Sequence, residues 1–86
     1  MRHEFTTHGT CSRRIDFDLE DGLVKNVRFQ GGCPGNTLGV AALAEGRSPE
    51  ELISILKGIK CGPKPTSCPD QLAKALEAAL AEEARA

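Results

Sequence analysis

The chain has 86 residues, which is enough for one small domain spanning residues 1–86 and leaves no room for a second. Hydrophobic residues make up 40% of the chain and aromatic residues only 3%, so the composition is globular but the core must consist of aliphatic side chains. A formal net charge of −1 does not support nucleic acid as a partner, because dedicated nucleic-acid binders carry a basic excess. No apolar run approaches the roughly 18 residues of a membrane span.

The N-terminal residues, MRHEF, contain no apolar signal core, so we expect the protein to stay in the reducing cytoplasm. Structural disulfides are rare in that compartment. The four cysteines therefore predict metal binding or redox chemistry, not a disulfide framework. Because so small a domain has a thin core, a metal site would also stabilise the fold.

Alternating apolar and polar residues predict β-structure in the first third of the chain. We expect a short edge strand over residues 3–7 and two longer strands over 13–19 and 23–29. The longer strands form a hairpin, and we expect a three-residue loop, Glu20-Asp21-Gly22, to close it.

The length of that loop determines which residues face each other across the hairpin. A three-residue loop pairs Leu19 with Leu23, Ile15 with Val27, and Arg13 with Phe29. Extending the same register places Cys11 opposite Gly31 and diagonal to Cys33, so we expect these two thiols to lie near each other.

Proline, glycine and capping residues predict three helices after the hairpin. The first begins at Pro34 and ends at Gly46, and the second begins at Pro49 and ends near Gly58. A loop over residues 60–66 leads to the last helix, which opens at Ser67-Cys68-Pro69-Asp70 and carries an apolar stripe of Leu72, Leu76 and Leu80. Strands followed by helices indicate an α+β fold: an antiparallel sheet of two or three strands with about three helices on one face.

The candidate site residues are the four cysteines, Cys11, Cys33, Cys61 and Cys68. Their spacing contains no Cys-x-x-Cys, so neither a zinc knuckle nor a thioredoxin-type pair is indicated. All four are expected at a strand end, in a loop or at a helix start, and none on an apolar stripe. We therefore predict that the four thiolates converge on one soft cation, with zinc the first choice and an iron–sulfur cluster the second.

Other uses of the cysteines and their neighbours stay open. One or two of the thiols could be ordinary buried cysteines, or Cys61 with Cys68, or Cys11 with Cys33, could form a redox pair. We expect His3 to be solvated, and Arg13 and Arg14 to be solvated or ion-paired, with phosphate binding as their alternative role. The sequence contains no carboxylate pair, Ser-His-Asp set or Walker-type loop, so we do not expect the chain to be catalytic alone.

The run Thr66-Ser67-Cys68-Pro69-Asp70-Gln71-Leu72 resembles the signature of the TSCPD domain family. The resemblance extends over about residues 3–80 and includes Gly31-Gly32-Cys33 and Gly58-Ile59-Lys60-Cys61-Gly62. That family comprises small stand-alone bacterial proteins and the C-terminal domain of adenosylcobalamin-dependent ribonucleotide reductases. The resemblance implies an accessory or interaction module with a reductase as its partner, or a thiol-redox role in ribonucleoside-diphosphate reduction for deoxyribonucleotide and hence DNA synthesis.

The order of strands, helices and cysteines is also similar to that of U-type iron–sulfur cluster assembly scaffolds, whose fold we expect here. In that comparison Cys11, Cys33 and Cys68 match the three scaffold cysteines. Arg13 and Ser67 stand where the scaffold has an aspartate and a histidine, and Cys61 is additional. These departures favour a permanent all-cysteine site over cluster transfer, although a scaffold role and a homodimer remain alternatives.

Overall fold

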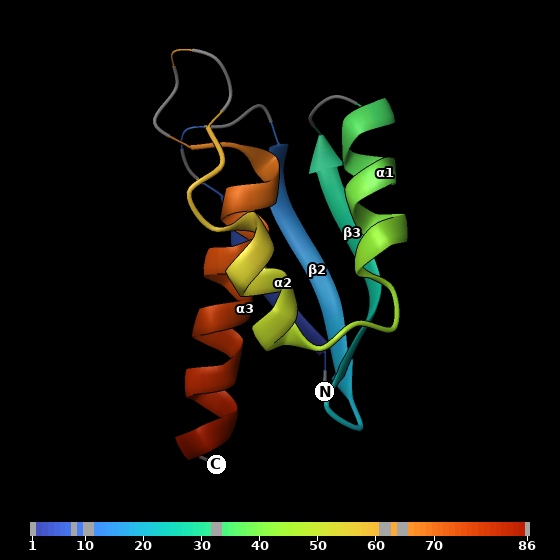
Figure 1. Ribbon diagram of the computed structural model, residues 1–86, viewed down its shortest axis with the longest axis vertical. Coiled ribbons are helices and arrows are strands. Elements are labelled where there is room, and N and C mark those ends of the chain that lie inside the picture. The colour runs from blue at the N-terminus through green and yellow to red at the C-terminus, as the bar shows by residue number, and fades with distance from the viewer. Residues whose placement is uncertain are drawn as a thin grey trace.

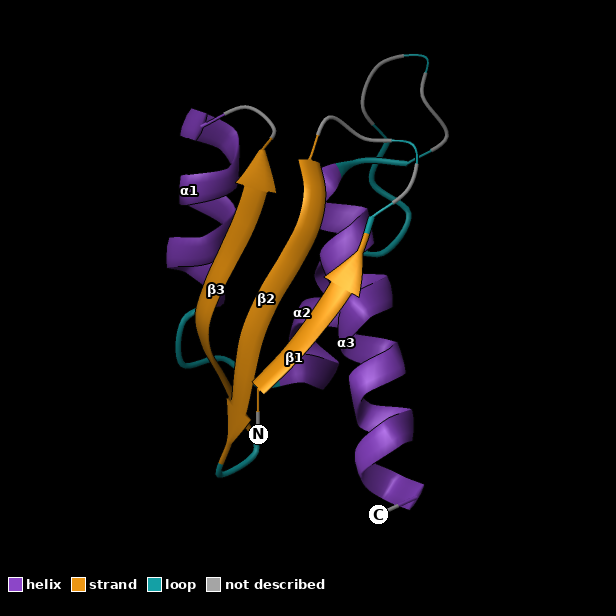
Figure 2. Cartoon of the chain, turned by 180° about the vertical axis from the view of Figure 1, so that it is seen from behind, coloured by secondary structure: helices purple, strands orange, loops and turns teal. Residues whose placement is uncertain are grey.

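The computed structural model describes residues 2–7, 9, 12–31, 34–60, 63 and 66–85. Its elements are β1 (Arg2–Thr6), β2 (Ser12–Glu20), β3 (Leu23–Gly31), α1 (Pro34–Ala44), α2 (Pro49–Leu56) and α3 (Cys68–Arg85). The strands form one antiparallel sheet in the order β1-β2-β3, and all three helices lie on the same side of it (Figures 1 and 2). The predicted α+β fold is confirmed, and no helix of the described residues covers the opposite face of the sheet.

The hairpin of β2 and β3 differs from the predicted register. A two-residue turn, Asp21-Gly22, closes it with left-handed φ angles of 53° and 75°. Asp-Gly favours this turn because its backbone twist matches that of the flanking strands. The predicted three-residue loop is therefore wrong, as are its pairs of Leu19 with Leu23, Ile15 with Val27, and Arg13 with Phe29.

Register shifts between β2 and β3 keep apolar side chains opposite one another on the buried face. With the two-residue turn and a regular ladder, apolar residues of β2 would lie opposite polar residues of β3. A register shift between Asp16 and Asp18 places Ile15 opposite Phe29, where an uninterrupted ladder would place Arg28. Asn26 lies within the shifted stretch of β3 and has a left-handed φ of 54°. A second shift follows Ser12, which lies opposite Gly31, so the predicted pairing of Cys11 with Gly31 is also wrong.

The core lies between the sheet and the helices; α3 supplies most of the buried helical side chains, and Ala44 of α1 and Leu52 of α2 complete it. The largest fully buried side chains include Ile15, Phe17 and Val24 from the sheet and Leu72 and Leu76 from α3. Each such side chain contributes about 1.5–3 kcal/mol when it leaves water. The leucine stripe predicted for the last helix is therefore its buried face.

His3 was expected to be solvated, and this prediction is wrong. Its side chain is only 7% exposed, because β1 packs against α3. The imidazole Nε2 lies 2.7 Å from Oε2 of Glu83, and the ring stacks on Phe17 with centroids 5.5 Å apart. His3 thus connects the first strand to the end of the last helix.

Candidate functional site

Of the four candidate ligands, the structure describes Cys68 alone; Cys11, Cys33 and Cys61 lie outside the described residues. Helix α3 begins at Cys68, as predicted, and the cysteine is only 5% exposed. The start of a helix favours an anionic group, because its free N–H groups and dipole present positive charge there.

Ser67 caps this helix and also attaches it to the segment after α2. Its Oγ accepts a hydrogen bond from the backbone N–H of Asp70 at 3.2 Å, which is the usual role of an N-cap residue. The same hydroxyl donates to the carbonyl oxygen of Ile59 at 2.7 Å. The chain just before position 60 is therefore held against the start of α3.

Asp70 makes a second connection between these two segments. Its side chain is 4% exposed, and Oδ1 accepts a hydrogen bond from the backbone N–H of Gly58 at 2.7 Å. Oδ2 accepts a hydrogen bond from the hydroxyl of Thr66 and lies 3.3 Å from Nζ of Lys74. Burial alone would raise the pKa of Asp70, but the contacts with Thr66, Gly58 and Lys74 outweigh it and lower the pKa below its ordinary 3.8. The group is thus a carboxylate at neutral pH.

Thr66 is held from two sides. Its hydroxyl donates to Asp70 and accepts a hydrogen bond from Nε2 of Gln71 at 3.0 Å. The polar residues on either side of Cys68 therefore form a clamp, consisting of Thr66, Ser67, Asp70 and Gln71, which holds the start of α3 in place. Sequence reasoning did not assign these roles, although the Ser-x-x-Asp spacing of a capping motif was a usable signal for Ser67 and Asp70.

The described residues next to the other cysteines lie at the same end of the domain. Ser12 begins β2 directly after Cys11, and Gly31 ends β3 two residues before Cys33. These two residues are paired, and the start of α3 lies at the same end of the sheet (Figure 1). Within the part of the chain that the structure describes, no three His, Cys, Asp or Glu side chains form a group that could hold a metal ion.

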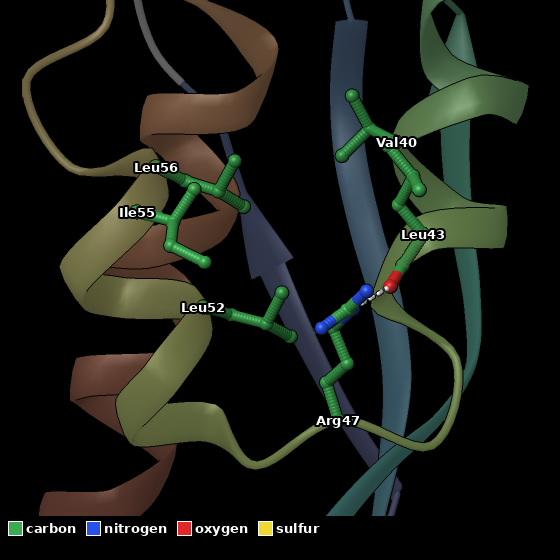
Figure 3. A pocket seen from close by; sticks show the side chains of 6 residues that line it. All are labelled: Val40, Leu43, Arg47, Leu52, Ile55 and Leu56. Atoms are coloured by element: carbon green, nitrogen blue, oxygen red, sulfur yellow. Dashed lines mark hydrogen bonds between the residues drawn. The ribbon is translucent and has the colours of Figure 1, made fainter.

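A separate apolar groove lies between α1 and α2 (Figure 3). It encloses about 180 Å³ and is lined by Val40, Leu43, Arg47, Leu52, Ile55 and Leu56. Nε of Arg47 donates to the carbonyl oxygen of Leu43 at 2.7 Å across one end of it. Leu43 and Ile55 remain 67% and 58% exposed. Apart from Arg47, the lining side chains are all aliphatic, so the groove is a mainly apolar surface.

Comparison with known proteins finds a match to a protein family. A family model described as the TSCPD domain matches residues 1–80. No curated protein and no solved structure matches the chain. Among the described residues, no helix has the length and apolar character needed to cross a membrane.

Proposed function

The chain belongs to the TSCPD domain family, and we propose that it is a small cytoplasmic metal-binding module. Its proposed ligands are Cys11, Cys33, Cys61 and Cys68. Zinc is the first candidate, because four thiolates form a closed tetrahedral site of the kind that stabilises small domains. An iron–sulfur cluster is the second candidate. Such a site supplies folding free energy and leaves no open position for a substrate.

The clamp around Cys68 carries this proposal. Ser67 and Asp70 hold Ile59 and Gly58 against the start of α3, so the chain leaves this point only a few residues before Cys61. The pairing of Ser12 with Gly31 brings the flanking residues of the other two cysteines to the same end of the sheet. A buried thiol at a helix start that the clamp holds in place fits a preorganised ligand for a cation.

Elemental analysis of anaerobically purified protein tests the metal site. We expect about one zinc per chain, and we expect Cys68→Ser to lose most of it and to unfold at lower urea concentration. A chelator supplies the matched control: the stability of the wild type should then fall to that of the variant. Wild-type protein that contains no metal and folds equally well with and without chelator would refute the proposal. A brown protein with visible absorption would select the cluster over zinc.

We further propose that the module acts beside a ribonucleotide reductase, in keeping with the domain context of its family, and not as an enzyme on its own. The direct test is binding of the metal-loaded protein to a purified adenosylcobalamin-dependent reductase from which the equivalent C-terminal domain has been removed. Saturable binding supports the proposal, and its absence contradicts it. Reversible formation of one disulfide in folded, metal-free protein would instead support a thiol-redox role, and cluster transfer to an acceptor would support a scaffold.

A further inference from the structure

A hollow lies near the start of β2. Arg14 and Gln30, which line it, alternate with the buried Ile15 and Phe29, so they lie on the face of the sheet opposite the helices (the face toward the viewer in Figure 2). The hollow measures about 290 Å³ and is lined by Arg13, Arg14 and Gln30. Successive side chains of a regular strand point to opposite faces, so two consecutive arginines should not line one hollow. The register shift between Ser12 and Arg14 breaks this alternation. This break allows both arginines to line the same hollow.

One buried carboxylate orients most of this site. The side chain of Asp16 is 4% exposed, and its Oδ2 accepts hydrogen bonds from Nη2 of Arg14 at 3.2 Å and from Nε2 of Gln30 at 3.3 Å. Its Oδ1 lies 2.8 Å from Nε of Arg14, an ion pair that lacks the alignment of a hydrogen bond. Arg14 keeps further N–H donors beyond those directed at Asp16. Because Arg14 and Gln30 are already held in place, a ligand would lose little free energy in ordering them.

The charges around the hollow are unbalanced. Among the described residues, Arg13 makes no side-chain hydrogen bond or ion pair. Arg14 is paired with Asp16, and Nη2 of Arg2 lies 3.6 Å from Oδ2 of the same carboxylate, so these two arginines share it. Arg13 is therefore the arginine of the hollow that has no carboxylate partner among the described residues. The site therefore retains positive charge that no described group neutralises.

We propose that this hollow binds the phosphate groups of a small phosphorylated ligand. Guanidinium groups match phosphate oxygens in a bidentate geometry, and two of them with an amide donor suit a phosphate or a diphosphate. The volume lies at the small end of the range for ligand pockets. The net charge of −1 opposes binding to a polynucleotide, and Phe5, Phe17 and Phe29 pack in or against the core, so they offer no stacking platform on the open face.

Titration of ¹⁵N-labelled, metal-loaded protein with inorganic phosphate and with pyrophosphate tests the proposal. We expect saturable shifts centred on Arg13, Arg14 and Gln30, with tighter binding of pyrophosphate. Arg13→Gln should weaken pyrophosphate binding about tenfold, because it removes a charge-assisted contact without disturbing Asp16. Arg47→Gln removes the same charge in the groove between α1 and α2 and should leave the affinity unchanged.

Several results would overturn this assignment. Shifts that do not saturate, or equal weakening by Arg13→Gln and Arg47→Gln, would indicate only a general charge effect. A single-stranded oligonucleotide that binds more tightly than pyrophosphate would refute the small ligand. Metal content is measured after each titration, since pyrophosphate also binds cations. Shifts confined to the start of α3 with loss of metal would likewise refute the anion site while leaving the metal proposal intact.

Discussion

Asp70→Asn should destabilise the protein although it hardly changes the shape of the side chain. The carboxylate accepts hydrogen bonds from Gly58 and Thr66 and contacts Lys74. An asparagine oxygen can still accept from Gly58. Its amide nitrogen is a donor, so it cannot accept the proton of the Thr66 hydroxyl, and it faces the ammonium group of Lys74.

The magnitude follows from the exposure of these groups. The bond from Thr66 to a buried carboxylate is worth about 1.5–3 kcal/mol, as hydrogen bonds to charged groups are. The Lys74 side chain is 48% exposed, so its contact adds no more than about 0.5 kcal/mol. We therefore expect Asp70→Asn to lower the free energy of unfolding by about 2–3 kcal/mol, from a total of about 4–13 kcal/mol for a domain of this size. The midpoint of thermal unfolding should fall by about 10–20 °C.

Urea unfolding followed by far-ultraviolet circular dichroism measures this loss, because the chain has no Trp or Tyr for fluorescence. Glu50→Gln makes the same chemical change on the exposed face of α2 and should cost less than about 0.5 kcal/mol. In a double-mutant cycle with Thr66→Val, the two positions should be coupled. Equal effects of Asp70→Asn and Glu50→Gln, or additive effects with Thr66→Val, would refute the clamp.

The lowered pKa of Asp70 also fixes how the effect depends on pH. A carboxyl whose pKa is lower in the folded state stabilises the protein fully above its unfolded pKa, close to 3.8, and loses that contribution as the pH falls through the folded pKa. The difference in stability between wild type and Asp70→Asn should therefore be constant near neutral pH and shrink below about pH 4. A difference that stays constant down to pH 2 would contradict this assignment.

Other predictions follow from burial and backbone geometry. Leu72→Ala should lower the free energy of unfolding by about 2–5 kcal/mol, because Leu72 is fully buried. Leu43→Ser, at a side chain that is 67% exposed, should lower it by less than about 0.5 kcal/mol. Similar losses for the two variants in urea unfolding would contradict the packing described here. Asn26 has a left-handed φ, so Asn26→Ala should lower the free energy of unfolding by about 1 kcal/mol in the same assay, and Asn26→Gly should lower it by less. The reverse order would show that the register shift in β3 does not impose this conformation.

The hairpin shows where sequence reasoning succeeded and where it failed. Alternation correctly placed Ile15, Phe17 and Leu19 on the buried face. It could not predict the register, because two register shifts interrupt the regular pairing; in β3, Val24 and Val27 are both buried although they are three residues apart. A left-handed Asn26 is a single-residue feature, and asparagine also occurs at ordinary strand positions.

Around Cys68, too, some features could be predicted from the sequence and others could not. Cys68 at a helix start was readable from Ser67, Pro69 and Asp70, since capping is a local interaction. The use of Asp70 and Ser67 to hold Gly58 and Ile59 was not readable, because it joins residues 8 to 12 positions apart that approach only when α2 packs against α3.

The sequence by itself determined the helix starts and stops, the α+β order and the leucine stripe, because proline, glycine, capping residues and hydrophobic period act within one or two turns of the chain. Only the tertiary structure decided that His3 is buried against Glu83, that Arg13 and Arg14 line one hollow, and that Asp16 orients Arg14 and Gln30. Each of these depends on how strands and helices are placed against one another, and that placement is set by packing across the whole domain.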